Sequence, residues 1–247
     1  MTSNIKEFTK TYFLTADECN PEQEMPLTLV MSRVIDIATL HANAWGVGYA
    51  KLIEENQGWV LSRVTIEMDR YPQVNEEYSF TTWIEDYNRH FSQRNMEIRD
   101  KDGAVIGGVR TIWMVINYAT RESVDISKLA YIRDNISARK CPITPQSRMR
   151  PVTEGRSVPY TFQYTDCDVN RHVNTVRYLE LLMNQFPLEK WDKEQVHRLE
   201  IAFMHETRFG DTLTVHVDDS DPLDCKLSID DATVSHCRAR FVFTPRG

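Results

Sequence analysis

Hydrophobic positions recur along the chain with two spacings, and each spacing predicts one kind of element. Between residues 30 and 45 they recur every three or four residues, which predicts an amphipathic helix. From Trp59 to Met68 the period is two, which predicts a strand with one buried face. Three further runs of alternation predict strands at 78–84, 94–99 and 105–116.

The second half of the chain repeats this order of elements. A strand at 160–164 precedes a helical stripe from Val173 to Phe186. Alternation then returns in four runs, at 199–203, 213–217, 227–229 and 234–243. The pattern predicts an α+β protein made of two similar copies, each with a helix covering one face of a curved antiparallel sheet. Two unrelated α+β domains are the alternative.

A segment rich in basic residues and proline separates the two halves. Residues 133–156 contain three prolines and six arginine or lysine residues against two acidic ones. We therefore expect folded units at 1–132 and 157–247, joined by a basic linker. The length of 247 residues corresponds to about 1.6 average domains, which fits one large domain or two small ones.

Composition and charge exclude several classes of function. The longest run without an acidic or basic residue, 37–50, is shorter than the roughly 20 residues that cross a membrane, so no membrane segment is expected. Residues 1–10 carry three charges where a signal peptide would be apolar, so a cytoplasmic protein is expected. A net charge of −7 argues against a general nucleic-acid binder. The five cysteines are widely spaced without a CxxC pair, so neither a disulfide framework nor a four-thiolate zinc site is expected, and no other zinc-binding spacing appears.

Residues 165–174, TDCDVNRHVN, hold the densest group of reactive side chains. Asp168, Asn170 and His172 occupy alternate positions, which an extended or turn conformation can point to one side. Asn174 is suited to cap the helix that follows, and the N–H groups of that helix end could hold a developing oxyanion. Turn formation and capping are the competing explanation, because Asp and Asn favour such positions.

Glu206 is a second candidate. In the strand predicted from residue 199 onward, it lies on the face opposite Phe203 and His205. A carboxylate there, next to a helix N-terminus, could act as a general base. A plain surface glutamate is the alternative, and His205 is expected to be a packed or rim histidine.

Three segments together resemble one known family. The run DVNRHVN, followed by a helix, resembles the DxNxHVNN signature of the acyl-acyl-carrier-protein thioesterases of plant plastids and bacteria. WVLSRVTIEMDRYP (59–72) and IRDKDGAVIGGVRTIWMVIN (98–117) are similar to further segments of that family. The resemblance implies a double hotdog fold, in which each of two tandem units wraps an antiparallel sheet around a long helix, in agreement with the repeat.

The resemblance also implies the site residues. Asp168, Asn170 and His172 match the catalytic Asp, Asn and His of the family. Glu206 matches a glutamate that precedes a cysteine in the plant enzymes, but here Thr207 stands in the place of that cysteine. A cysteine nucleophile is therefore disfavoured, and direct attack by water is favoured.

The repeat predicts one active site per chain. LSRVTIEMDRYP (61–72) aligns without gaps with LEIAFMHETRFG (199–210), at an offset of 138. That offset places four other residues at the positions of the site: Val30, Ser32, Val34 and Met68. The first half is then expected to line an apolar tunnel for the acyl chain, with Ile37, His41 and Trp45 as walls. Ordinary core packing is the alternative for these three residues.

The resemblance implies a hydrolase that releases fatty acid from fatty acyl-acyl carrier protein without a cofactor. Acyl carrier protein is acidic, so a basic surface should meet it, either the linker or RHFSQR at 89–94. An enzyme of the same fold acting on coenzyme A thioesters and a non-catalytic acyl-binding protein are the alternatives. A homodimer is left open.

Overall fold

The computed structural model describes residues 5–246, with the side chains of all but three of them, Lys128, Ala130 and Tyr131. The chain divides into two compact units, Met1–Pro145 and Gln146–Gly247, called unit 1 and unit 2 below. The boundary falls inside the segment that the sequence marks as a linker.

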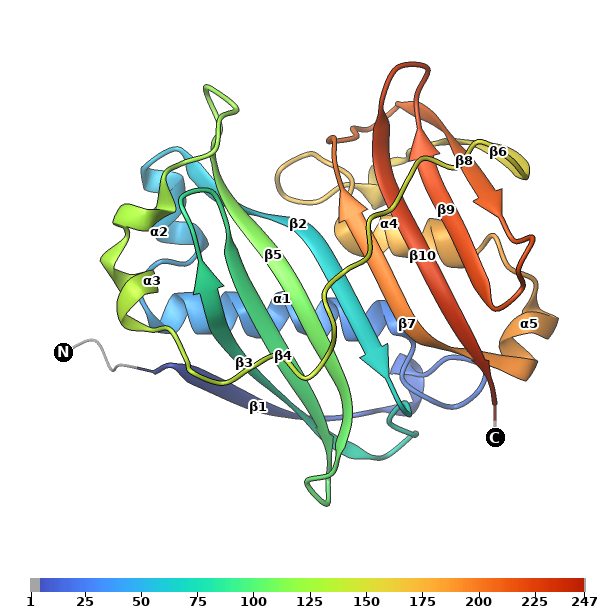
Figure 1. Ribbon diagram of the computed structural model, residues 1–247, viewed down its shortest axis with the longest axis horizontal. Helices are drawn as coiled ribbons and strands as arrows, with labels where there is room; N and C mark the ends of the chain where they lie inside the picture. The colour runs from blue at the N-terminus through green and yellow to red at the C-terminus, as the bar shows by residue number, and fades with distance from the viewer. Residues whose placement is uncertain (1–4, 247) are drawn as a thin grey trace. The chain divides into compact units, whose positions relative to one another are not determined.

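Unit 1 is an antiparallel sheet of five strands with one long helix across it (Figure 1). The strands lie in the order β1-β3-β4-β5-β2. Their bounds are β1 (Glu7–Phe13), β2 (Gln57–Met68), β3 (Glu77–Tyr87), β4 (Ser92–Asp100) and β5 (Val105–Asn117). The helices are α1 (Leu27–Ala44), α2 (Tyr49–Glu54) and α3 (Ala130–Asp134), with 3-10 turns η1 (Ala16–Glu18) and η2 (Ile126–Lys128).

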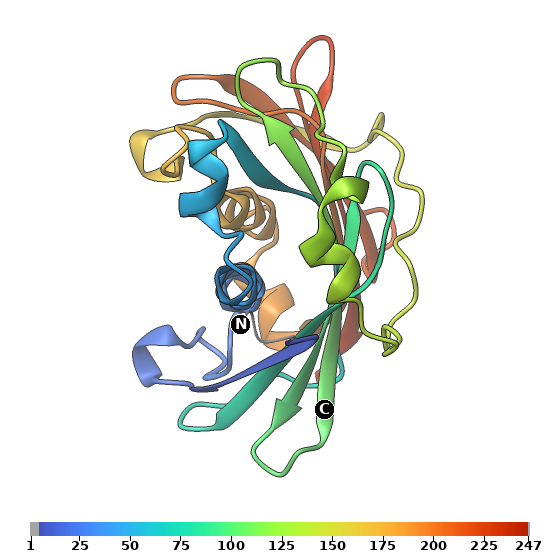
Figure 2. The same cartoon turned by 90° about the vertical axis from the view of Figure 1, so that its left-hand side faces the viewer.

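Helix α1 forms where the period of three to four residues predicts it, and its apolar stripe is buried. Viewed end on, it lies on the concave side of the sheet of unit 1, which curves around it (Figure 2). The helix begins after Pro26, whose extended backbone leads into the first turn, and ends before Gly46, whose φ of +75° stops it. Val34 and Ile37, in the middle of the stripe, are fully buried.

Unit 2 repeats the arrangement with a shorter helix. Its strands lie in the order β7-β10-β9-β8-β6. Their bounds are β6 (Arg156–Thr161), β7 (Glu194–Phe203), β8 (Thr212–Asp218), β9 (Asp224–Asp230) and β10 (Ser235–Pro245). The helices are α4 (Thr175–Met183) and α5 (Leu188–Lys193), with the 3-10 turn η3 (Tyr164–Asp166). Helix α4 has 9 residues where α1 has 18. Each unit is a hotdog, an antiparallel sheet around a helix, so the α+β tandem hotdog predicted from the sequence is confirmed.

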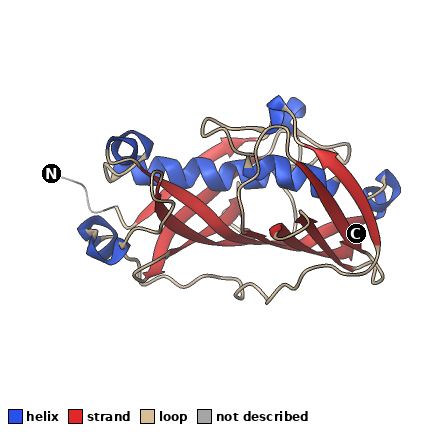
Figure 3. Cartoon of the chain, turned by 90° about the horizontal axis from the view of Figure 1, so that it is seen from above, coloured by secondary structure: helices blue, strands red, loops and turns tan. Residues whose placement is uncertain are grey.

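Residues 137–155 contain neither helix nor strand and form a long loop (tan in Figure 3). Its first part is held by unit 1, where Arg110 Nη2 donates to Ile143 O at 2.9 Å. Its second part is held by unit 2, where Gln146 Nε2 donates to Ile201 O at 2.8 Å. In the part of the chain that is described, no helix combines the length and apolar character needed to cross a membrane.

Candidate functional site

The loop before α4 folds back on itself and is shaped by Asp168. The Asp168 N–H donates to His172 O at 2.8 Å, and the Asp168 carboxylate accepts from Asn170 N at 2.8 Å. Arg171 takes a φ of +63° at the tip of this turn. Asp168 therefore forms the turn contacts that are expected of an Asp in a loop. The same contacts also fix the position of His172.

Two backbone contacts join this loop to the segment that follows β7. Val173 N donates to Thr207 O at 2.8 Å, and His172 pairs with Arg208. They bring His172 Nε2 to 3.2 Å from Glu206 Oε2, with side chains 19% and 33% exposed. A histidine and a carboxylate in contact and accessible to water can exchange a proton with a bound water.

The expected position of Glu206 within a strand is wrong. Strand β7 ends at Phe203, and Glu206 lies in the loop beyond it. The alternation of period two therefore does not extend to this residue. Its direction is set instead by the hydrogen bonds that hold the loop.

Asn174 caps α4 as predicted, and the cap uses most of the helix N-terminus. Its side chain accepts from Val176 N at 2.8 Å, while its carbonyl accepts from Arg177 N at 3.0 Å and Tyr178 N at 3.3 Å. Within the described residues, the Thr175 N–H has no hydrogen-bond partner. The helix end therefore offers one free amide rather than several.

Asn170 and Thr207 differ sharply in exposure. Asn170 is exposed at the tip of the loop, and its side chain makes no hydrogen bond within the described part of the chain. Thr207 is 1% exposed, so its hydroxyl is shielded from solvent within the structure. The burial of Thr207 agrees with attack on the thioester by water rather than by a side chain at this position.

Among the described residues, no three His, Cys, Asp or Glu side chains lie close enough to hold a metal.

Unit 1 contains a second copy of the loop. Gln23 has a φ of +61°, and Asn20 N donates to Glu24 O at 3.0 Å. Met25 N donates to Pro72 O at 2.8 Å, as Val173 N does to Thr207 O. Equivalent residues of the two units are therefore 148 positions apart in the loop before the helix. They are 135 positions apart in the segment after the following strand.

This match corrects the alignment at a single offset of 138. Because α1 is longer than α4, the offset changes across the helix. Structural counterparts of the four site residues are Asn20, Glu22, Glu24 and Tyr71, not Val30, Ser32, Val34 and Met68. The pair equivalent to His172 and Glu206 is thus Glu24 and Tyr71.

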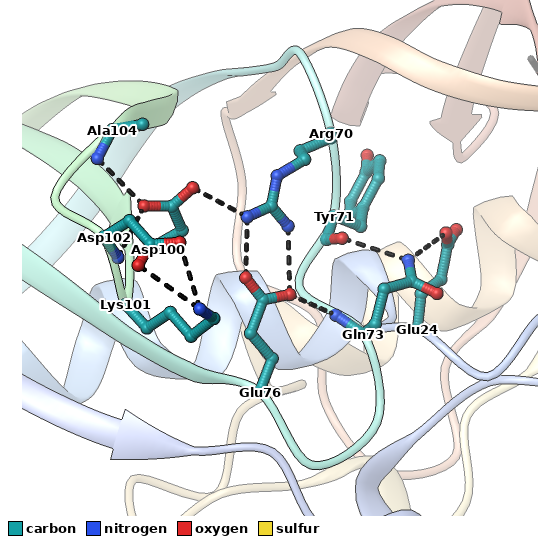
Figure 4. Close-up of polar contacts among 9 residues, drawn as sticks. All are labelled: Glu24, Arg70, Tyr71, Gln73, Glu76, Asp100, Lys101, Asp102 and Ala104. Atoms are coloured by element: carbon teal, nitrogen blue, oxygen red, sulfur yellow. Dashed lines mark hydrogen bonds and ion pairs between the residues drawn. The ribbon is translucent and has the colours of Figure 1, made fainter.

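In the unit 1 copy of the loop, hydrogen bonds and ion pairs connect the residues around Glu24 and Tyr71 (Figure 4). Gln73 Nε2 donates to the Glu24 carboxylate at 3.4 Å and to Tyr71 O at 3.2 Å. Arg70 bridges Glu76 at 2.6 Å and Asp100 at 2.8 Å. Glu24 and Tyr71 are 6% and 4% exposed. The pair equivalent to His172 and Glu206 thus has neither a histidine nor an accessible carboxylate, which supports one site per chain.

The three predicted tunnel walls, Ile37, His41 and Trp45, are all buried. His41 Nε2 is 2.8 Å from Ile5 O, and His41 Nδ1 accepts from Arg94 at 2.9 Å. Burial and the Arg94 charge lower the pKa of His41 to about 4, so its imidazole is neutral near pH 7. These contacts are those of the core-packing alternative.

Most of the predicted basic surface is already paired. In the 89–94 segment Arg94 is buried, and Arg89 pairs with Asp125 at 3.3 Å. In the linker, Arg139 pairs with Glu97 at 2.6 Å. Lys140 likewise pairs with Glu85 at 3.2 Å.

Two exposed basic residues of the linker are not paired with an acidic side chain in the described part of the chain. Arg148 and Arg150 make no ion pair within the described residues. They border a groove of about 430 Å³ in unit 2, between residues 147–154 and strands β8 to β10.

Comparisons with known proteins agree with the whole architecture. Residues 5–132 match the sequence model of the acyl-ACP thioesterase N-terminal domain, and residues 149–244 match that of the C-terminal domain. A crystal structure of an acyl-ACP thioesterase from Bacteroides thetaiotaomicron superposes with a TM-score of 0.90 and 31% identity, over 99% of this chain and 100% of that one. The 12:0-ACP thioesterase from Umbellularia californica has the same fold, with a TM-score of 0.85 and 20% identity over 97% and 98% of the two chains.

Curated relatives are longer than this chain. The palmitoyl-acyl carrier protein thioesterase of Arabidopsis thaliana is 21% identical over 216 residues, which cover 81% of this chain and 52% of the relative. The dodecanoyl-[acyl-carrier-protein] hydrolase of Cinnamomum camphora is 20% identical over 224 residues, 83% of this chain and 58% of the relative. The chain spans about half the length of the curated relatives it matches.

Proposed function

Because the chain belongs to the acyl-ACP thioesterase family, we propose that it hydrolyses a fatty acyl thioester carried on acyl carrier protein. The products are the free fatty acid and the carrier thiol. The observation that carries the proposal is the 3.2 Å contact between His172 Nε2 and Glu206 Oε2, in a water-accessible loop pair.

In the proposed reaction, water is the nucleophile and Glu206 is the general base. The His172 Nε2–H donates to Glu206 and orients it, while the carboxylate takes a proton from the water that attacks the thioester carbon. The carbon–sulfur bond then breaks, and the proton held by the pair passes to the departing sulfur. The second proton of the water leaves when the fatty acid ionises.

The other two candidates take different parts in this proposal. Asp168 acts as a positioning residue, because its carboxylate already accepts loop N–H groups. Asn170, with its free amide, and the Thr175 N–H are the donors available to the thioester oxygen as it gains charge. The base is therefore assigned to Glu206 rather than to Asp168.

A substrate panel tests the function and separates it from its two alternatives. The same acyl groups are offered on acyl carrier protein and on coenzyme A, in a series of chain lengths. We expect kcat/KM to be at least about 10-fold higher on the carrier protein, which requires only about 1.4 kcal/mol of extra binding at the transition state. A higher value on coenzyme A would identify a coenzyme A enzyme, and no hydrolysis of either series would refute the proposal.

The exposed arginines of the linker are the proposed contact for the acidic carrier. Arg148 and Arg150 stand two positions apart in the loop and border the same groove, so both can meet one partner. Reversal of both charges, R148E with R150E, should raise KM for acyl carrier protein about 3-fold to 10-fold at low salt and leave coenzyme A kinetics unchanged. Equal effects on both carriers would contradict the docking role. Arg139 and Lys140 are unsuitable for this test, because reversing them breaks ion pairs inside unit 1.

A further inference from the structure

A buried polar chain lies directly behind Glu206. Thr207 Oγ1 is 2.8 Å from His236 Nδ1, and His236 Nε2 is 3.2 Å from Asp231 Oδ2. Thr207 is 1% exposed and His236 is 7% exposed, so both are removed from solvent, whereas Asp231 stands at the surface of the β9–β10 turn. The chain thus runs from the surface inward to the residue next to the proposed base.

His236 holds the Glu206 segment at two places. Its carbonyl accepts from Met204 N at 2.9 Å and from His205 N at 3.3 Å, and its side chain meets Thr207. Glu206 lies between these two attachments. Because Thr207 O also accepts Val173 N from the His172 loop, the same anchor reaches both partners of the His172–Glu206 pair.

A β-bulge directs the His236 side chain. Ser235 pairs with Asp230 and Cys237 pairs with Ile229, so His236 is the extra residue between them. An extra residue in one strand turns its side chain away from the regular alternation and is common beside active sites.

Unit 1 builds the same bulge with an apolar residue in the place of His236. There Ile98 pairs with Gly107 and Arg99 with Val105, which leaves Ile106 as the extra residue. Its carbonyl accepts Asp69 N at 2.9 Å, as the His236 carbonyl accepts Met204 N, and Pro72 stands in the place of Thr207.

The fold therefore needs neither the histidine nor the threonine. Burying a polar side chain costs free energy unless it is hydrogen-bonded, and unit 1 avoids the cost with isoleucine and proline. This Thr–His–Asp chain is present only in the unit that carries the His172–Glu206 pair, whereas unit 1 links Arg70 to Asp100 by an ion pair. A role beside that pair therefore explains why unit 2 buries these polar side chains.

The direction of the hydrogen bonds follows from Asp231. Backbone N–H groups of Val234 and Thr233 lower the pKa of this carboxyl, so it is ionised near neutral pH. It then accepts the proton on His236 Nε2, which leaves Nδ1 as the acceptor for the Thr207 hydroxyl. A fixed tautomer of this kind holds Thr207 in one rotamer.

We propose that Thr207, His236 and Asp231 are positioning residues that hold Glu206 in its contact with His172. This inference rests on the proposed role of Glu206 as general base. A displacement of a catalytic group by about 1 Å can cost up to about 100-fold in rate, which is the scale of effect available to such residues.

The test substitutes the chain and reads kcat and KM separately. Thr207→Val and His236→Ile should each lower kcat about 10-fold to 100-fold and change KM less than about 2-fold. Thr207→Ser keeps the hydroxyl and should restore kcat to within about 3-fold of the parent protein. Full kcat in both Thr207→Val and His236→Ile, or no recovery with Thr207→Ser, would overturn the proposal. If His236→Ile fails to fold, the Thr207 pair still decides.

A double-mutant cycle separates positioning of Glu206 from general loss of structure. If Thr207 acts through Glu206, Thr207→Val should cost less than about 2-fold when Glu206 is already Gln. An equal loss in both backgrounds would refute the inference. Glu206→Gln with full activity would instead refute the proposed role of Glu206 as general base, and absence of hydrolysis by the parent protein would refute the proposed function, so these failures are distinguishable.

A Ser–His–Asp arrangement elsewhere in unit 2 offers a control for the Thr–His–Asp chain. Ser157 Oγ is 2.8 Å from His216 Nδ1, and His216 Nε2 is 3.8 Å from Asp230 Oδ2. It has similar chemistry but does not contact residues 204–207. His216→Ile should leave kcat within about 2-fold, and a loss equal to that of His236→Ile would show that removing any such histidine disturbs unit 2.

Discussion

The loop before the long helix has the same backbone contacts in both units and entirely different chemistry. In unit 2 it brings His172 to Glu206 in reach of water, whereas in unit 1 the equivalent Glu24 and Tyr71 are buried. The left-handed tip residues, Gln23 and Arg171, differ by only 2° in φ. Loop geometry is therefore a property of the fold, and reactivity is added by a few side chains placed on it.

The repeat thus supplies an internal control for each residue of the proposed site. A residue that serves only the loop should have the same effect when it is changed in either unit. A residue that serves the reaction should affect activity in unit 2 alone. Each of the next two predictions applies this comparison.

The largest difference is expected at the His172–Glu206 pair. Glu206→Gln or His172→Gln should lower kcat about 100-fold to 10,000-fold, because the first removes the base that takes the proton from water and the second removes the imidazole that orients this base. In unit 1, Glu24→Gln keeps the shape of the side chain and should leave kcat within about 2-fold. The measurement is steady-state hydrolysis of one acyl-carrier substrate, with melting temperatures recorded for all variants. Equal losses in the two units, or full activity of both unit 2 variants, would contradict the comparison.

A smaller difference is expected at the turn residue that both loops share in function. Asp168 accepts His172 N at 3.4 Å as well as Asn170 N, and Asn20 Oδ1 accepts Glu24 N at 2.9 Å. Asp168→Ala and Asn20→Ala should each lower the free energy of unfolding by about 1 kcal/mol. Only Asp168→Ala should also lower kcat, by about 10-fold to 100-fold, because it releases His172. Loss of stability without loss of kcat in Asp168→Ala would restrict Asp168 to a structural role.

The helix, the strands and the repeat follow from periodicity, because burial of one face imposes a period on the residues that form it. The alternation of period two ends with β7, so extending it wrongly places Glu206 in a strand. The single offset of 138 between the two units fails for another reason, because α1 and α4 differ in length. The resemblance to a family supplied the four candidate site residues, but no local pattern marks His236, which reaches Thr207 from another strand.

The sequence also gives no indication of ion pairs between residues that are far apart along the chain. The linker residue Arg139 pairs with Glu7, which lies far away along the chain. A count of charges in the linker therefore overstated the basic surface that is free to bind a partner. Only the folded structure shows which of these charges are already neutralised.

The last prediction concerns stability rather than activity, at His41 in the core of unit 1. Burial and Arg94 lower the pKa of His41 to about 4, below the value of about 6.5 in an unfolded chain. The unfolded state then binds a proton that the folded state does not, so His41 contributes its full stability above pH 6.5 and loses it as the pH falls to 4.

Between pH 7 and pH 5 this loss should be about 2 kcal/mol for the parent protein, and His41→Gln should remove most of it, because glutamine keeps a donor for Ile5 O and does not titrate. Urea unfolding at both pH values measures the difference. Four of the five tryptophans lie in unit 1, so their fluorescence reports on the unit that contains His41. His216→Ile, a change in unit 2, should leave the tryptophan-detected pH dependence unchanged. An equal loss of stability in the parent and in His41→Gln would show that other groups of unit 1 account for it.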